Sequence, residues 1–279
     1  MTTRLFACAV ATLTFLTAAA RAEESLEELK VRLQKNWEPW KGCEPGSWIQ
    51  MRTKTQSGNG HTESEHRQTL VSRNEKGLTV EIRTVKRSKN AEGNEVVELG
   101  EPYTSTTAAG SQAANYEDFK DLRHETIEVA GTKLDCRVIE ATMVYKYPQP
   151  VNGQTEMRTK MTLWISPEVR EMGGLVKTEA DTDNQGAGFG AGSSDMTLID
   201  RDQELKIGDL TVKCSIYRFG TATGKESMTG SGEMWFSADL PSGYAKSKMV
   251  MHMKQGAGTT RSESEMEVTG MEIVKPKTD

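Results

Sequence analysis

The segment RHETIEVAGTKLDCRV, residues 123–138, returns without gaps 78 positions later as RDQELKIGDLTVKCSI, residues 201–216. Apolar residues match at 127/205, 129/207, 134/212 and 138/216, and Cys136 matches Cys214. They alternate with polar residues, which is the pattern of a strand with one buried face. Further on, Trp164-Ile165-Ser166 matches Trp235-Phe236-Ser237. Cysteine and tryptophan are scarce, so these matches favour an internal repeat, 123–177 and 201–246, over chance similarity.

The same alternation extends toward the N-terminus. Residues 48–56, 61–73 and 77–86 follow the period of a strand, and turn signals at 57–60 and 74–77 separate them. Regular antiparallel strands predict a mainly β fold, a sheet curled into a half-barrel or barrel. Residues 114–123 are the one later stretch that suggests a short helix.

One amphipathic helix is predicted before the sheet, over residues 25–37. Ser25 and Glu28 form a capping-box pattern, Leu26, Leu29 and Leu33 follow at helical spacing, and Pro39 ends the run. The apolar stripe needs a partner, which we expect to be the sheet.

The first 22 residues have the pattern of a secretory signal. Arg4 precedes an apolar run with the small-x-small ending Ala20-Arg21-Ala22, and the run is too short to span a bilayer. We expect cleavage near Ala22, a periplasmic or secreted protein, and a single domain over residues 23–279 without a transmembrane segment. Loss of Arg4 and Arg21, with no acid, changes the net charge from −5 to −7. This acidic balance argues against a nucleic-acid partner.

A signal, an amphipathic helix and a long antiparallel meander together resemble the periplasmic lipoprotein carriers (LolA/LolB-like), half-barrels that wrap around a helix and bind acyl chains. The chain is also similar to uncharacterised exported bacterial proteins, in which a Gly-x-x-x-Cys-x-Val strand is followed by a Trp-x-Ser strand. Residues 132–138 with 164–166, and 210–216 with 235–237, are the segments that resemble this pattern, although Gly131 and Gly208 lie farther from the cysteines and Ile216 stands in place of valine.

Methionine is abundant, with 14 in the chain. Strand alternation places Met249, Met251 and Met253 on one face, and it gives Met161 and Met234 similar positions on their strands. Three interpretations stay open. These side chains line a deformable cavity for an acyl chain, Met249, Met251 and Met253 hold Cu(I), or all of them are ordinary core. Trp164 and Trp235 are predicted on the opposite face, packed against the helix or exposed for binding.

Three cysteines follow the signal. Cys136 and Cys214 occupy equivalent strand positions and either form a disulfide or remain buried thiols, and Cys43 is expected to be unpaired. The sequence contains no catalytic motif, and we expect neither a cofactor nor an enzymatic activity. The leading hypothesis is an envelope protein that binds a lipid or the acyl chain of a lipoprotein. The alternatives are a protein-interaction or structural module with an envelope partner, and a Cu(I)-binding protein.

Overall fold

The computed structural model describes residues 24–35, 40–58, 60–75, 77–89, 95–108, 115–151, 154–182, 192–223, 228–255 and 258–275. The predicted signal peptide, residues 1–22, lies outside these ranges. One α-helix, α1 (Leu26–Lys35), and one short 3-10 segment, η1 (Glu171–Gly174), occur within them. The strands are β1 (Trp48–Ser57), β2 (Gly60–Asn74), β3 (Gly77–Lys89), β4 (Glu95–Leu99), β5 (Tyr103–Ala108), β6 (Asn115–Val129), β7 (Thr132–Val151), β8 (Gln154–Ile165), β9 (Leu175–Thr182), β10 (Gly192–Ile207), β11 (Leu210–Thr223), β12 (Met228–Phe236), β13 (Tyr244–Gln255) and β14 (Gly258–Glu272).

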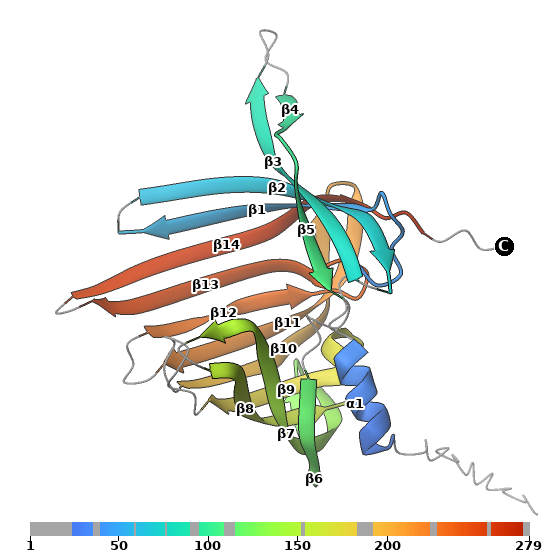
Figure 1. The fold of residues 1–279 in the computed structure, drawn as a ribbon. Coiled ribbons are helices and arrows are strands. Elements are labelled where there is room, and N and C mark those ends of the chain that lie inside the picture. Colours follow the sequence, from blue (N-terminus) through green and yellow to red (C-terminus); the bar gives the residue numbers. More distant parts are fainter. Residues whose placement is uncertain are drawn as a thin grey trace, which may run out of the picture.

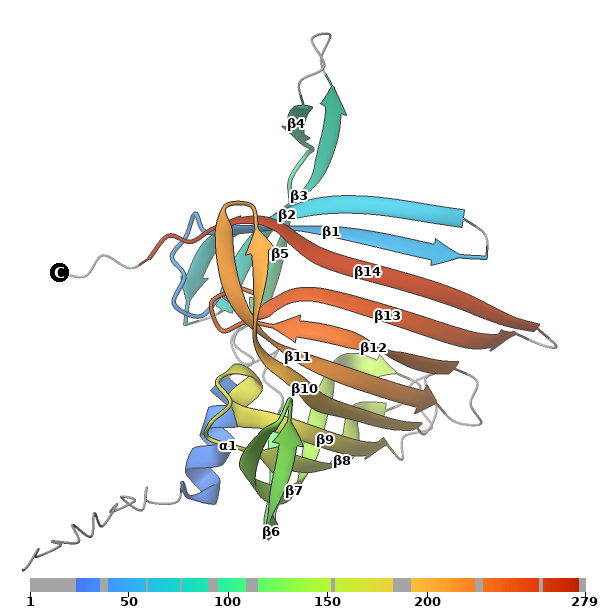
Figure 2. The same cartoon turned by 180° about the vertical axis from the view of Figure 1, so that it is seen from behind.

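All the strands belong to one antiparallel sheet of 14 strands, in the order β4-β3-β2-β1-β14-β13-β12-β11-β10-β9-β8-β7-β6, with β5 paired to β3. The first strand, β1, therefore pairs with the last strand, β14, and this pair lies inside the sheet and not at its edge. The sheet is curled but not closed (Figures 1 and 2). The predicted fold class, a mainly β curled sheet with one N-terminal helix, is confirmed.

The helix begins as its capping box predicts. The Ser25 backbone N–H donates to the Glu28 carboxylate at 2.9 Å, and the Glu28 N–H donates to the Ser25 hydroxyl at 3.2 Å. Leu29 and Leu33 are buried against Ile139 and Leu163 of β7 and β8. The amphipathic stripe thus finds the partner that the sequence required.

The predicted strands at 48–56, 61–73 and 77–86 are present as β1, β2 and β3. The short helix suggested for residues 114–123 is wrong, because the described part of that segment lies in β6. Its pairing with β7 along the whole strand outweighs the weak local helical preference.

The two hairpins that contain the repeated segments, β6–β7 and β10–β11, both have register shifts in their first strand. Register shifts occur in β6 at Glu117/Lys120 and Asp121/Arg123, and in β10 at Leu198/Asp200 and Asp200/Gln203. A bulge adds a residue to one strand and bends it. Each bent hairpin, β6–β7 or β10–β11, then packs its tip over strands farther along the sheet.

These tips form two separate cores. The tip of β6–β7 brings Leu134, Cys136 and Val138 against Leu198 and Tyr217. The tip of β10–β11 packs against β14, β1 and β2. There Val212 and Cys214 share a core with Ile49, Met51, Leu70 and Val268. The repeat seen in the sequence is therefore a repeat of a covering hairpin.

The Trp-x-Ser segments also match in structure. The backbone N–H of Ser166 donates to Gly174 O at 2.8 Å, and that of Ser237 donates to Gly243 O at 3.1 Å. Each tryptophan lies under the lysine of the neighbouring strand. Lys177 Nζ is 4.5 Å from the Trp164 ring centre, and Lys246 Nζ is 5.8 Å from that of Trp235.

Candidate functional site

Residues that are register partners from strand to strand form a row across the sheet, which we call a rung. On one face of the sheet, two complete rungs that cross ten strands, from β7 to β2, carry no charged residue. The first rung runs through Ala141, Met161, Ala180, Ser194, Thr221, Gly230, Met251, Ser262, Ser57 and Gly60. The second runs through Ile139, Leu163, Thr178, Met196, Phe219, Gly232, Met249, Ser264, Thr55 and Thr62. We call this surface the charge-free face.

The other face has the opposite character. The rung between the two just described reads Glu140, Thr162, Glu179, Asp195, Gly220, Ser231, Val250, Glu263, Gln56 and His61. Ion pairs such as Lys246–Glu265, at 3.0 Å, cross neighbouring strands there. Strand alternation has therefore sorted the charges almost completely onto one face.

All five methionines singled out from the sequence lie on the charge-free face. Met249, Met251 and Met253 follow one another along β13, Met161 lies on β8, and Met234 is paired with Ser247 of β13. Each is half-buried, whereas the leucines and valines at the covered end of the sheet are buried. Sequence analysis missed Met196, Met228 and Phe219 on the same face, although the alternation of β10, β11 and β12 contains that signal.

Two glycines shape this surface. A Cβ atom at Gly230 would overlap Met251 Sδ, and one at Gly232 would come within 2.8 Å of Phe219 Cε1. The Met251 and Phe219 side chains therefore lie flat over β12. The result is a mainly apolar surface, interrupted by Ser194 and Thr221. We call it the methionine floor and define it as Met161, Met196, Phe219, Met228, Met234, Met249, Met251 and Met253.

Three segments cover one end of the charge-free face. Helix α1 covers β7 to β9, the β6–β7 tip covers β9 to β11, and the β10–β11 tip covers β14 and β1 to β3. In Figure 1, α1 lies at one end of the strands, and the arrowheads of β1 and β13 point away from it. The part of the methionine floor on β13 lies toward those uncovered ends, whereas Met161 and Met196 pack against the core under α1.

Small hydroxyl side chains replace methionine as the face continues from β13 to β2. We call Ser247, Ser262, Ser264, Thr53, Thr55, Ser57, Thr62 and Ser64 the hydroxyl patch. Thr55 Oγ1 and Ser264 Oγ are 3.4 Å apart and share a hydrogen bond. The uncharged face therefore has an apolar part and a polar part, side by side.

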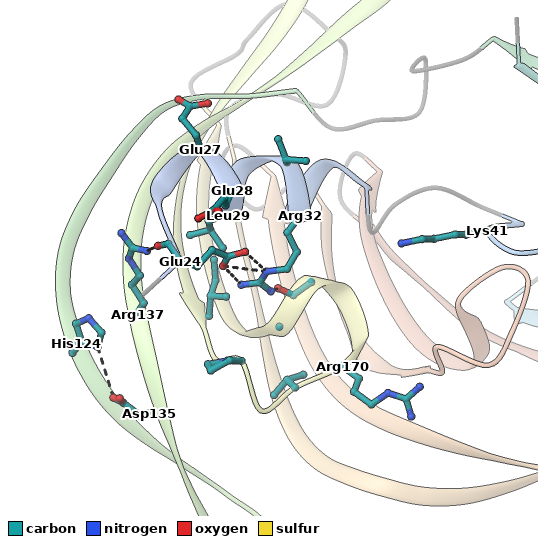
Figure 3. A pocket seen from close by; sticks show the side chains of 16 residues that line it. Glu24, Glu27, Glu28, Leu29, Arg32, Lys41, His124, Asp135, Arg137 and Arg170 are labelled. Atoms are coloured by element: carbon teal, nitrogen blue, oxygen red, sulfur yellow. Dashed lines mark hydrogen bonds and ion pairs between the residues drawn. The ribbon is translucent and has the colours of Figure 1, made fainter. Parts of the chain in front are cut away.

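A second feature is a cleft of about 1300 Å³ beside α1, lined by Glu24, Leu29, Arg32, Lys41, Arg137, Ile165 and Arg170 among others (Figure 3). Several of its charged side chains form bonds within the protein. Arg32 donates to the Glu24 carboxylate at 2.7 Å and also to Gly173 O, and Arg137 donates to Glu24 O and to Asp121. The Arg137 guanidinium lowers the pKa of the Asp121 carboxyl. These bonds anchor the start of α1 to η1 and β7.

Of the two alternatives for Cys136 and Cys214, the structure has the buried thiols. Cys43, Cys136 and Cys214 are all buried free thiols. Cys136 and Cys214 do hold equivalent positions, but each lies inside its own covering hairpin, and the two belong to different cores. Burial raises the pKa of both thiols to about 11.

The two tryptophans occupy neither of the predicted environments. They do lie on the face opposite the methionines, since Trp164 pairs with Lys177 and Trp235 pairs with Lys246. However, Trp164 is only 4 % exposed and packs in the core of the β6–β7 tip, while Trp235 packs with the β10–β11 core. The bends of the hairpins, which local sequence does not reveal, cover them.

We next consider which side chains could bind a metal ion. In the described ranges, no three His, Cys, Asp or Glu residues gather in a suitable way. On the methionine floor, Met228 pairs directly with Met253, beside Met251. Met228 therefore adds a thioether beside the three methionines of the Cu(I) hypothesis, Met249, Met251 and Met253.

Comparison with known proteins gives likeness in fold alone. No family model matches, and no curated protein matches at a significant level. Among solved structures, the chain is similar to an outer membrane lipoprotein-sorting protein domain from Vibrio parahaemolyticus, with 11 % identity, a TM-score of 0.33, and coverage of 91 % of this chain and 92 % of that one. It is also similar to a DUF1329 family protein from Desulfovibrio piger, with 9 % identity, a TM-score of 0.35, and coverage of 90 % and 93 %.

A third similar structure is MucB in complex with MucA, with 9 % identity, a TM-score of 0.19, and coverage of 88 % of this chain and 94 % of that one. The first of these structures is a lipoprotein-sorting domain, the kind of protein that the sequence layout resembles. No helix of the described ranges has the length and apolar character needed to cross a bilayer.

Proposed function

We propose that this chain is an exported envelope protein that binds the acyl chain of a lipid or lipoprotein on the methionine floor and catalyses no reaction. The observation that carries the proposal is the charge-free face, half-buried and covered at one end only among the described residues. A sheet face that serves only as core is covered along its length, because apolar surface left in water costs about 25 cal/mol per Å².

The size and chemistry of the floor fit an acyl chain. Six strands, β8 to β13, lie side by side at about 4.8 Å spacing, so the floor extends ~24 Å across the strands. One leaflet of a bilayer has acyl chains about 15 Å deep. Thioether side chains adapt to an irregular or changing apolar shape, which suits a ligand of variable length.

The experiment measures binding of the uncharged fluorophore Nile red to the mature protein. Met251→Lys places a charge on the methionine floor and is expected to weaken binding about tenfold or more, because the charge must be desolvated. Val250→Lys is the matched control, since Val250 is the next residue on β13 but points to the charged face, where it pairs with Glu263. Equal binding by both variants would count against the proposal.

Native mass spectrometry of protein purified from its own envelope identifies the natural ligand. A bound lipid supports the proposal. Bound copper that is lost in Met251→Leu supports the Cu(I) alternative at Met249, Met251 and Met253. An empty protein that also fails to bind Nile red overturns lipid binding and leaves the protein-interaction module as the function to pursue.

A further inference from the structure

The two borders of the methionine floor differ in chemistry. At β8 and β9 the floor meets α1, whose Leu29 and Leu33 are buried against Leu163. At β13 and β14 it meets the hydroxyl patch, where Met249 pairs with Ser264 and Met251 pairs with Ser262. An amphiphile that lies across the strands therefore has an apolar border at one end and a polar border at the other.

The hydroxyl patch is polar but not ionic. Along the two rungs of the charge-free face, no lysine or arginine is available to neutralise an anionic head. The nearest cations in the register, such as Lys54 and Lys248, are on the opposite face, where they lie in one rung with Glu265. An ion held without a partner against a protein surface loses hydration that it does not regain.

His66 is the first ionisable side chain that the face meets beyond the patch, where it pairs with Met51. Burial lowers the pKa of His66, so its imidazole is neutral near pH 7. Its side chain adds hydrogen-bonding capacity without charge, and Gln68 is 3.5 Å from it.

We infer that the ligand is an amphiphile with an uncharged, hydroxyl-bearing head, such as a glycerol or sugar, which lies on the hydroxyl patch while the acyl chain runs over the methionine floor toward α1. This inference rests on the proposed function and deepens it. Serine and threonine hydroxyls donate and accept hydrogen bonds, as do the hydroxyls of such a head. Each hydroxyl that loses its hydrogen bond to water on binding therefore gains a hydrogen bond to the ligand or to the protein.

The test compares amphiphiles with the same twelve-carbon chain: monolauroylglycerol and dodecyl glucoside as neutral heads, and laurate as the anionic head. Calorimetric titration is expected to give neutral-headed ligands an affinity about tenfold above that of laurate. Equal or tighter binding of laurate at pH 8 overturns the inference.

A pair of variants locates the head. Thr55→Val with Ser264→Ala removes two hydroxyls at nearly constant shape and is expected to lower the affinity for dodecyl glucoside while that for Nile red stays unchanged. Thr162→Val with Ser231→Ala makes the same chemical change on the opposite face and serves as control. Thermal unfolding confirms that both pairs fold.

The outcomes separate this inference from the proposed function. If Nile red and all three amphiphiles fail to bind, the proposed function itself is wrong. If Nile red binds and Met251→Lys weakens that binding, but the unmodified protein binds all three heads alike or Thr55→Val with Ser264→Ala binds dodecyl glucoside as tightly as the unmodified protein, only the orientation and head selectivity are wrong.

Discussion

Met251 of β13 lies over Gly230 of β12, with its Sδ atom in the space that a Cβ atom at residue 230 would occupy. The same strand leaves room at Gly232 for the ring of Phe219. Glycine weakens a strand, so Gly230 is explained by the close approach of the Met251 side chain, and Gly232 by that of the Lys248 backbone oxygen and the Phe219 ring. The methionine floor thus depends on the absence of side chains as much as on the methionines.

A first prediction concerns this contact. Gly230→Ala is expected to push Met251 out of its place and to lower the free energy of unfolding by about 1–3 kcal/mol, as overpacking does. Urea denaturation checks the stability, and Nile red titration checks that the floor is disturbed. Gly58→Ala is the control, because a Cβ there meets nothing within 4 Å. Equal stability of the two variants would contradict the assigned role of Gly230.

The two equivalent thiols predict an effect of alkaline pH. Burial raises the pKa of Cys136 and Cys214 from 9.0 to about 11, so between these pH values the unfolded chain loses protons that the folded protein keeps. The free energy of unfolding must therefore fall as pH rises from 9 to 11. The double variant Cys136→Ala/Cys214→Ala is expected to show a shallower fall, since other alkaline groups, such as Tyr217, titrate in both proteins.

The same burial predicts the redox state of the cysteines. In the folded protein at pH 8, a thiol reagent is expected to leave Cys136 and Cys214 unmodified, and to label them after unfolding in urea without a reductant. Both are almost wholly shielded from solvent, with exposed fractions of 0 and 1 %. Failure to label after unfolding would reveal a disulfide and contradict the two separate cores.

Arg32 is predicted to hold α1 in place. Its guanidinium bonds to the Glu24 carboxylate and to Gly173 O. Arg32→Met leaves that carbonyl without its donor and is expected to lower the free energy of unfolding by about 1–3 kcal/mol. Hydrogen exchange should speed up in α1 and leave β13 unchanged. Glu27→Gln, on the exposed side of α1, should leave both unchanged.

The two Trp-x-Ser turns are predicted to contribute equally to the free energy of unfolding. The hydroxyl of Ser166 accepts from the N–H of Glu168 at 3.4 Å, and that of Ser237 accepts from the N–H of Asp239 at 3.3 Å. Ser166→Ala and Ser237→Ala are expected to cost similar amounts, about 1 kcal/mol each, and to add in the double variant. Thermal and urea unfolding measure both values. A large difference between them would show that the turns are not energetic equivalents.

The local pattern of the sequence was sufficient for the elements and for the faces of the strands. The capping box at Ser25 and Glu28 and the period of two in residues 48–86 depend on neighbours in the chain, and they appear in the structure as predicted. Alternation alone put the methionines on one face and the tryptophans on the other, because successive side chains of a strand point in opposite directions. The fold class and the five methionine positions followed from that.

Only the tertiary structure decided which parts of the sheet are covered and whether the two cysteines meet. Cys136 and Cys214 are equivalent in the repeat, but the bends of β6 and β10 carry them into different cores, and no local signal gives the destination of a bent hairpin. The same bends bury Trp164, and among the described residues they leave the β13 part of the methionine floor uncovered. Non-local packing selects which part of a uniformly alternating face is core and which part is surface, since both have the same local pattern.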